Sequence, residues 1–280
     1  MIRRKGQPMK PLLGFVLLLT ALSTSAVAAD PEPKPAKEPG PENAKRAPDA
    51  KRILLITGED YQRRKKSRIK GHVWQETAPA LRDELQKDAR LEVDIVDDLK
   101  LLRSQDLSKY AAVVMHFKNY KPQVPGRAGY DNLASFVEKG GGLVLVHFAC
   151  GAFQEFKDDF VKLAGRVWNP ELRGHDRSGT FQVEVIKPDH PALAGLTSFE
   201  TTDELYTCLD GDTPIDVLAT AVSKVDGETY PMVFVLEYGE GRVFHCPLGH
   251  TVAALTNEPV AELFRRGTAW VAGMEAVEKK

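Results

Sequence analysis

Short, continuously apolar runs separated by a helical pattern constrain this chain more than any other feature. Residues 52–58 (RILLITG), 111–117 (AAVVMHF) and 143–147 (LVLVH) each have an uninterrupted apolar centre and are too short for buried helices. Between the first two, residues 73–87 follow a helical period and residues 91–97 alternate as a half-buried strand does. This order predicts an α/β fold, with a mostly parallel open sheet and helices on both faces.

The second half of the chain is richer in strand patterns. Helices are predicted over 128–139 and 150–164, on either side of the third apolar run. The later strand patterns lie at residues 180–186, 217–222, 232–238 and 242–247, and a final helical pattern covers 258–272. The last two strand patterns are joined by the short segment YGEGR, which is typical of a tight hairpin. We therefore expect antiparallel strands to extend the parallel sheet in the C-terminal half.

The first 29 residues have the pattern of a targeting signal. Basic residues precede the apolar run 12–22, which ends in the small-residue stretch STSAVAA. Residues 1–29 are therefore predicted to be a signal peptide, cleaved near Ala28 or Ala29, which would make the protein periplasmic or secreted. The apolar run is shorter than the ~20 residues of a membrane span, so no integral span is expected in the mature chain. An uncleaved amphipathic anchor is the alternative.

Composition separates a spacer from one folded domain. Residues 30–50 contain six prolines and no large apolar side chain, which predicts a disordered spacer. Residues 51–280 then form a single predicted domain. Lys and Arg number 38 against 39 Asp and Glu, so no basic excess marks a nucleic-acid binder. The basic segment 61–70 is interpreted as a solvated loop, with attraction of anionic ligands as the alternative.

Histidines stand where predicted strands end. His116 and His147 end two strands, His250 follows the last strand, and His72 lies in the loop after the first strand. Open α/β sheets bind ligands at the carboxyl ends of their strands. Imidazole can serve there as a metal ligand, a general base or a hydrogen-bond partner for sugar hydroxyls. The alternative for His116 is a buried core histidine.

Further candidates lie in the second half of the chain. His175, in the loop RGHDRSG, is either exposed or functional, whereas His190 and His245 are interpreted as structural. The segment Asp203-Glu204-Leu205-Tyr206 supplies a carboxylate that would act among histidines as a metal ligand or an acid/base partner. Its alternative is a solvated turn.

Three cysteines are too few for a disulfide scaffold. Cys150 lies at a predicted helix start, where the helix dipole would lower the thiol pKa. It comes three residues beyond the strand end, however, so we interpret it as a buried structural thiol. Cys208 and Cys246 could pair if their strands are adjacent.

Four separated segments together resemble one family. They are ILLITG…HVWQETAPALRDEL, FVEKGGGLVLVHFACGAF, HPALAGL with DELY, and YGEGRVFHCPLGHT…LFRRGTAWVAG. In this order, over nearly all of residues 51–275, they are similar to the ThuA-like (trehalose-utilisation) family. The resemblance implies a fold like that of class I glutamine amidotransferases. Amidotransferase activity is not expected, because His147 stands where those enzymes have their nucleophilic cysteine, and no His-x-Glu pair follows at His250.

The resemblance also implies a site and a function. It implies action on a small carbohydrate, a disaccharide or 3-keto-glycoside, by metal- or His/Glu-assisted isomerisation, elimination or hydrolysis. The implied catalytic residues are His147, Glu204 and His250, and the implied ligands of a divalent metal, zinc or manganese, are His72, His147 and His250. The residues expected to contact substrate are His72, Trp74, His116, His175 and Tyr206.

Two alternatives differ in their chemistry. A non-catalytic carbohydrate-binding module, held off a surface by the spacer, would stack sugars on aromatic side chains, for which the candidates are Trp74, Phe148, Phe153, Trp168 and Tyr206. Hydrolysis by paired carboxylates is the weaker alternative, because Asp203 and Glu204 are adjacent and would point to opposite faces of a strand.

Overall fold

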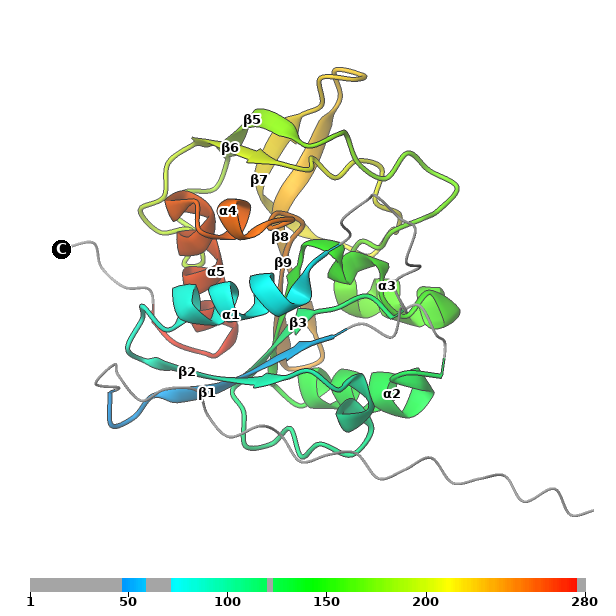
Figure 1. The fold of residues 1–280 in the computed structure, drawn as a ribbon, viewed down its shortest axis with the longest axis vertical. Coiled ribbons are helices and arrows are strands. Elements are labelled where there is room, and N and C mark those ends of the chain that lie inside the picture. The colour runs from blue at the N-terminus through cyan, green and yellow to red at the C-terminus, as the bar shows by residue number, and fades with distance from the viewer. Residues whose placement is uncertain (1–46, 59–71, 120–122, 276–280) are drawn as a thin grey trace, which may run out of the picture. The chain divides into compact units, whose positions relative to one another are not determined.

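A nine-stranded sheet organises the described part of the computed structural model, which comprises residues 47–58, 72–119 and 123–275 (Figure 1). The strand order is β2-β1-β3-β4-β9-β8-β7-β5-β6. The parallel strands are β1 (Lys51–Thr57), β2 (Leu91–Val96), β3 (Ala112–His116), β4 (Gly142–Val146) and β9 (Gly241–Cys246). The antiparallel strands are β5 (Gly179–Val185), β6 (Phe199–Asp203), β7 (Asp216–Val222) and β8 (Thr229–Tyr238). The predicted parallel half and antiparallel extension are both confirmed.

Helices cover both faces of this sheet, as predicted. On one face lie α1 (Trp74–Leu85), α4 (Val252–Leu255) and α5 (Glu258–Val271), and on the other lie η1 (Leu99–Arg103), α2 (Gly126–Glu138) and α3 (Lys157–Ala164) (Figure 1). Each face of the sheet has its own hydrophobic core. Successive strand side chains point to opposite faces, so Val114 packs in the core under α1, α4 and α5, and its neighbour Val113 packs in the core under η1, α2 and α3. Each fully buried Leu or Phe side chain contributes about 1.5–3 kcal/mol to stability.

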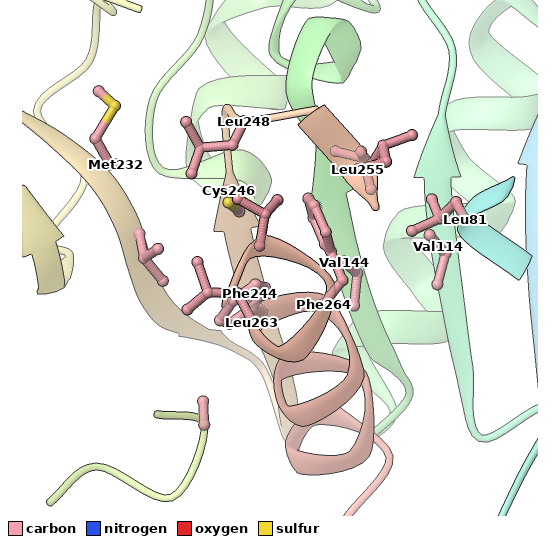
Figure 2. Packing of buried hydrophobic residues seen from close by; sticks show 14 of the residues in the cluster. Leu81, Val114, Val144, Met232, Phe244, Cys246, Leu248, Leu255, Leu263 and Phe264 are labelled. Carbon is pink, nitrogen blue, oxygen red and sulfur yellow. The ribbon is translucent and has the colours of Figure 1, made fainter. Parts of the chain in front are cut away.

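Helix α5 lies close against the centre of the sheet. Leu263 and Phe264 on the helix face Phe244 of β9 and Val144 of β4 (Figure 2). A Cβ at Gly267 would lie 2.7 Å from the Phe244 ring, so the helix can approach β9 this closely only with glycine there. This packing holds α5 against β4 and β9, the two strands that His147 and His250 follow.

The helix predicted over 150–164 is wrong at its start. After β4 the chain forms two 3₁₀ turns, η2 (His147–Gly151) and η3 (Gln154–Phe156), and α3 begins only at Lys157. The Cys150 carbonyl accepts a hydrogen bond from the Trp168 amide instead of from its own helix. The Phe153 amide donates to the Asn119 side chain, and Phe153 has a left-handed backbone with φ 49°. These tertiary partners replace the helical bonds that the apolar spacing predicts.

Some predictions concern residues that the structure does not describe. The signal peptide over 1–29, the spacer up to residue 46 and the basic segment 61–70 lie outside the described residues. Among the residues described, no helix combines the length and apolar character that crossing a bilayer requires.

Candidate metal and substrate site

Four side chains named by the sequence converge beyond the carboxyl ends of the parallel strands. His72 lies just before α1, His147 follows β4, Glu204 follows β6 and His250 follows β9. One possible ligand atom from each lies within 4.8 Å of all the others. His147 Nε2 is 3.1 Å from both His72 Nε2 and His250 Nδ1. Glu204 Oε2 is 3.2 Å from His250 Nδ1 and 3.5 Å from His147 Nε2. We call these four residues the His₃Glu cluster.

His147 is held in this cluster by its backbone and by its second ring nitrogen. The residue has a left-handed backbone with φ 48° at the turn from β4 into η2, and its side chain is fully buried. Its Nδ1 lies 2.9 Å from the Pro247 carbonyl, which can only accept, so Nδ1 carries the proton. Nε2 therefore presents a lone pair to the cluster, the arrangement expected of a metal-ligating histidine.

His72 contributes a neutral imidazole. Its ring stacks on Phe148 with ring centroids 4.1 Å apart and an interplanar angle of 11°. Burial, reinforced by the neighbouring His147 and His250, lowers the pKa of His72 to about 2. The ring therefore stays unprotonated near neutral pH and keeps a lone pair for coordination.

Glu204 and His250 form a close pair within the cluster. Burial opposes ionisation of Glu204, but the neighbouring imidazoles of His147 and His250 outweigh it and hold the pKa of Glu204 well below its usual range. The hydrogen bond to Glu204 raises the pKa of His250, against the effect of burial. The carboxylate is therefore ionised and supplies the negative charge that a divalent cation requires.

The aromatic side of the site is formed around Tyr206. This ring is 4 % exposed and meets His147 edge-on, with centroids 4.9 Å apart. His175 stacks on Tyr206 at 5.4 Å, and Trp168, half-buried, lies 5.8 Å from both rings. The His175 Nδ1 lies 2.8 Å from the Asp176 carbonyl and 3.9 Å from Glu204 Oε2. The structure therefore brings His175 and Tyr206 to the edge of the cluster, and their role as substrate contacts stays a prediction.

His116 lies behind the cluster as a buried histidine. The Thr57 hydroxyl donates to the His116 carbonyl at 2.8 Å and therefore accepts from His116 Nδ1 at 2.9 Å. Burial, with His147 nearby, lowers the pKa of His116 to about 3. Its ring meets the edge of Phe148, 5.0 Å away. Phe148 also stacks on His72, so it links His116 to the cluster. The predicted contact of His116 with substrate is untested. The predicted substrate contact Trp74 is half-buried at the first turn of α1.

Lys118, which contacts the Trp168 ring beside the cluster, was not singled out from the sequence. It follows β3 two residues after His116, and burial lowers the pKa of its ammonium. Its Nζ lies 5.3 Å from the centre of the Trp168 ring, within range of a cation–π contact. The signal in the sequence was its place beyond a strand end, but a single lysine after a strand is too common to be recognised.

The residues interpreted as structural lie away from the cluster. His245 is fully buried and bonds through Nδ1 to the Ala164 carbonyl at 2.9 Å, and His190 packs edge-on against Trp270. Cys150 is fully buried, and burial raises its thiol pKa to about 12, so the structural interpretation is confirmed. All three cysteines lie in the described residues and are free, so the suggested pairing of Cys208 with Cys246 is wrong.

The donor set of the cluster fits a divalent transition metal. Imidazole nitrogens and a carboxylate oxygen are ligands of zinc and manganese. Donors around a tetrahedral zinc are roughly 3.3 Å apart, close to the 3.1–3.5 Å between the neighbouring donors here. Metal binding is therefore chemically possible with these four residues, and it stays a prediction.

A large cavity lies elsewhere. Its volume is about 640 Å³, and its lining includes Ala111 and Gly141, which precede β3 and β4, together with Arg242. It therefore lies at the amino ends of the parallel strands, away from the cluster, where open α/β sheets do not usually bind their ligands.

Comparisons with known proteins agree with the fold and with the sequence motifs. The family model ThuA, described as trehalose utilisation, matches residues 61–271. A solved structure described as a ThuA-like protein from Parabacteroides merdae is 25% identical, with a TM-score of 0.70, over 82% of this chain and 93% of that chain. A second, from Bacteroides uniformis, is 21% identical with a TM-score of 0.63, over 81% and 94%.

A more distant likeness concerns the fold alone. The β-galactosidase of Bacillus circulans is 15% identical with a TM-score of 0.51, over 81% of this chain but 32% of that chain. No curated protein matches the chain.

Proposed function

The chain belongs to the ThuA (trehalose utilisation) family, and on this premise we propose that it is an exported protein that acts on a small carbohydrate at a divalent metal site. The observation that carries the proposal is the convergence of His72, His147, Glu204 and His250 at the carboxyl edge of the sheet. These four residues would hold the metal. Glu204 thereby becomes a ligand as well as the acid/base candidate named from the sequence.

The chemistry follows from what these residues can hold and move. A divalent metal here would act as a Lewis acid toward a sugar carbonyl or hydroxyl oxygen. The Pro247 carbonyl keeps the His147 Nε2 lone pair aimed into the cluster. The low pKa of His72, set by burial, keeps its imidazole free of a competing proton. The Tyr206 ring, packed edge-on against His147, limits how a substrate can approach.

His175 is the best-placed candidate for proton transfer. Its Nδ1 hydrogen bond to the Asp176 carbonyl leaves Nε2 as the basic nitrogen of the neutral ring. Protons on carbon next to a keto group are acidic, so a base near a carbonyl-polarising cation supports isomerisation or elimination of a 3-keto-glycoside. Hydrolysis by paired carboxylates is less favoured, because Asp203 is 1 % exposed and its oxygens bind backbone amides.

The binding-module alternative rests on aromatic side chains. Of the five candidates, Phe148, Phe153 and Tyr206 are buried, and Trp74 and Trp168 are half-buried. A sugar platform needs an exposed ring face, so the aromatic set favours the metal proposal.

Metal content of the purified protein tests the proposal. Residues 30–280, without the predicted signal peptide, are expected to contain about one zinc or manganese ion per chain. The variant His147→Ala should lose the metal. The variant His245→Gln, which changes a buried histidine that bonds the Ala164 carbonyl and is not part of the cluster, should keep it. A folded wild-type chain that takes up no divalent ion would refute the metal site.

Turnover of disaccharides and 3-keto-glycosides completes the test. Turnover that is lost on chelation and restored by metal would support an enzyme. Sugar binding that survives chelation, without turnover, would instead support the binding module. Export would be checked separately, by the N-terminal sequence of the protein recovered from the periplasm or medium, expected to begin near residue 30.

A further inference from the structure

We propose that Asp203 is a positioning residue that locks the loop carrying His250 to the strand end carrying Glu204, and so holds two of the metal donors in register. The inference rests on the metal site proposed above and adds a residue to which the sequence motifs gave no role of its own. It concerns the second layer of the site, because Asp203 acts through backbone amides rather than through the metal.

The contacts of Asp203 are unusual for a carboxylate. It is the last residue of β6 and only 1 % exposed. Its Oδ2 accepts the Gly249 amide at 2.6 Å, and its Oδ1 accepts the His250 amide at 3.1 Å. Oδ1 also accepts the amide of the next residue, Glu204, at 2.8 Å. Both oxygens are thus engaged by backbone N–H groups.

These bonds are strong and direction-specific. Burying an ionised carboxylate is costly unless hydrogen bonds replace its hydration, and bonds from N–H groups to a charged acceptor are roughly twice as strong as neutral ones. Two successive amides pointing at one anion also fix the orientation of the turn that carries them. The carboxylate therefore determines where the backbone of His250 lies relative to that of Glu204.

The same loop reaches a third member of the cluster. The loop of residues 247–250 supplies the Pro247 carbonyl that accepts from His147 Nδ1 at 2.9 Å. Its Gly249 has φ 111°, and a Cβ there would lie 2.7 Å from Leu255 Cδ2, so the shape of the loop is tightly constrained. Because Asp203 binds two amides of this loop, its effect extends to His147, Glu204 and His250.

The test compares two buried carboxylates. Asp203→Asn keeps the size of the side chain but replaces one acceptor oxygen with an NH₂ group, which cannot accept from a backbone amide. The matched control is Glu84→Gln, since Glu84 is 7 % exposed and its carboxylate bonds Arg265 at 3.0 Å, in α1 and α5 rather than in the loop. Both substitutions remove a buried charge, and Glu84 is not part of the cluster.

Affinity for Zn²⁺, measured by competition with a chromophoric chelator, and the visible spectrum of the Co²⁺-loaded protein are the readouts. We expect Asp203→Asn to weaken Zn²⁺ binding about 10- to 100-fold and to change the Co²⁺ spectrum. Glu84→Gln should leave both unchanged even where it lowers the melting temperature. Equal loss of affinity in the two variants would mean a merely structural role and would overturn the proposal.

The outcomes separate this inference from the proposed function. Wild-type protein that binds no metal refutes both. Wild-type protein that binds metal, with Asp203→Asn binding it equally well and giving the same Co²⁺ spectrum, refutes the role of Asp203 and leaves the metal site standing. If Asp203→Asn does not fold, hydrogen exchange of metal-free wild-type protein decides. Protected amides at Gly249 and His250 are expected, and exchange at the rate of an open loop would overturn the proposal.

Discussion

Two buried histidines should make the metal-free protein sensitive to mild acid. His116 and His245 are fully buried, and burial lowers their pKa values to about 3 and about 4. In the unfolded chain a histidine has a pKa of about 6.5. Below that pH these two histidines are protonated in the unfolded state but stay neutral in the folded state, so the free energy of unfolding falls. The loss approaches about 1.4 kcal/mol per pH unit for each histidine, or about 2 kcal/mol each and about 4 kcal/mol together between pH 7 and pH 5.

Urea unfolding in the presence of a chelator, at pH 7 and pH 5, measures this loss. The variant His245→Gln removes one titrating group and keeps an amide that can donate to the Ala164 carbonyl. Its loss between the two pH values should be about 2 kcal/mol smaller than that of the wild type. Other titrating groups, including His72 and His250, are common to wild type and variant, so their contributions cancel in the difference between the two losses. An equal pH-dependent loss in wild type and variant would refute the reasoning.

Three further outcomes are expected. Zinc or manganese at 100 times its Kd should raise the free energy of unfolding by about 2.7 kcal/mol, seen as a higher melting temperature, and His147→Ala should abolish the rise. Gly249→Ala should cost about 1–3 kcal/mol in urea unfolding and weaken metal binding, because φ 111° and the nearby Leu255 both oppose a Cβ; unchanged stability would contradict this. Iodoacetamide should label Cys208 in the native protein and spare Cys150 and Cys246, which are fully buried, as peptide mass spectrometry would show.

The fold was predictable where local pattern and long-range packing agree. A continuous apolar run such as 111–117 is typical of a strand buried on both faces of a parallel sheet, and β3 lies there. His116, His147 and His250 were predicted to gather because the carboxyl ends of parallel strands share one edge. The helix start at 150 failed because the Cys150 carbonyl and the Phe153 amide bind partners distant in sequence, Trp168 and Asn119. No local pattern contains those contacts.

The second layer of the site was beyond sequence reasoning for a related reason. Alternation along a strand predicted that the adjacent Asp203 and Glu204 would not form a facing acid pair. In the structure both oxygens of Asp203 accept backbone amides instead. Which group Asp203 would meet depends on how β6, an edge strand reached through β8, β7 and β5, is brought to the loop after β9. That approach depends on the antiparallel registers of the whole second half and on the curvature of the sheet.

The backbone of His147 links the fold to its use. A non-glycine residue at φ 48° is strained and persists only when its surroundings over-determine it. Here the imidazole bonds the Pro247 carbonyl on one side and faces His72 and His250 on the other. The strain is explained if the turn after β4 presents a ligand nitrogen of His147 to the cluster.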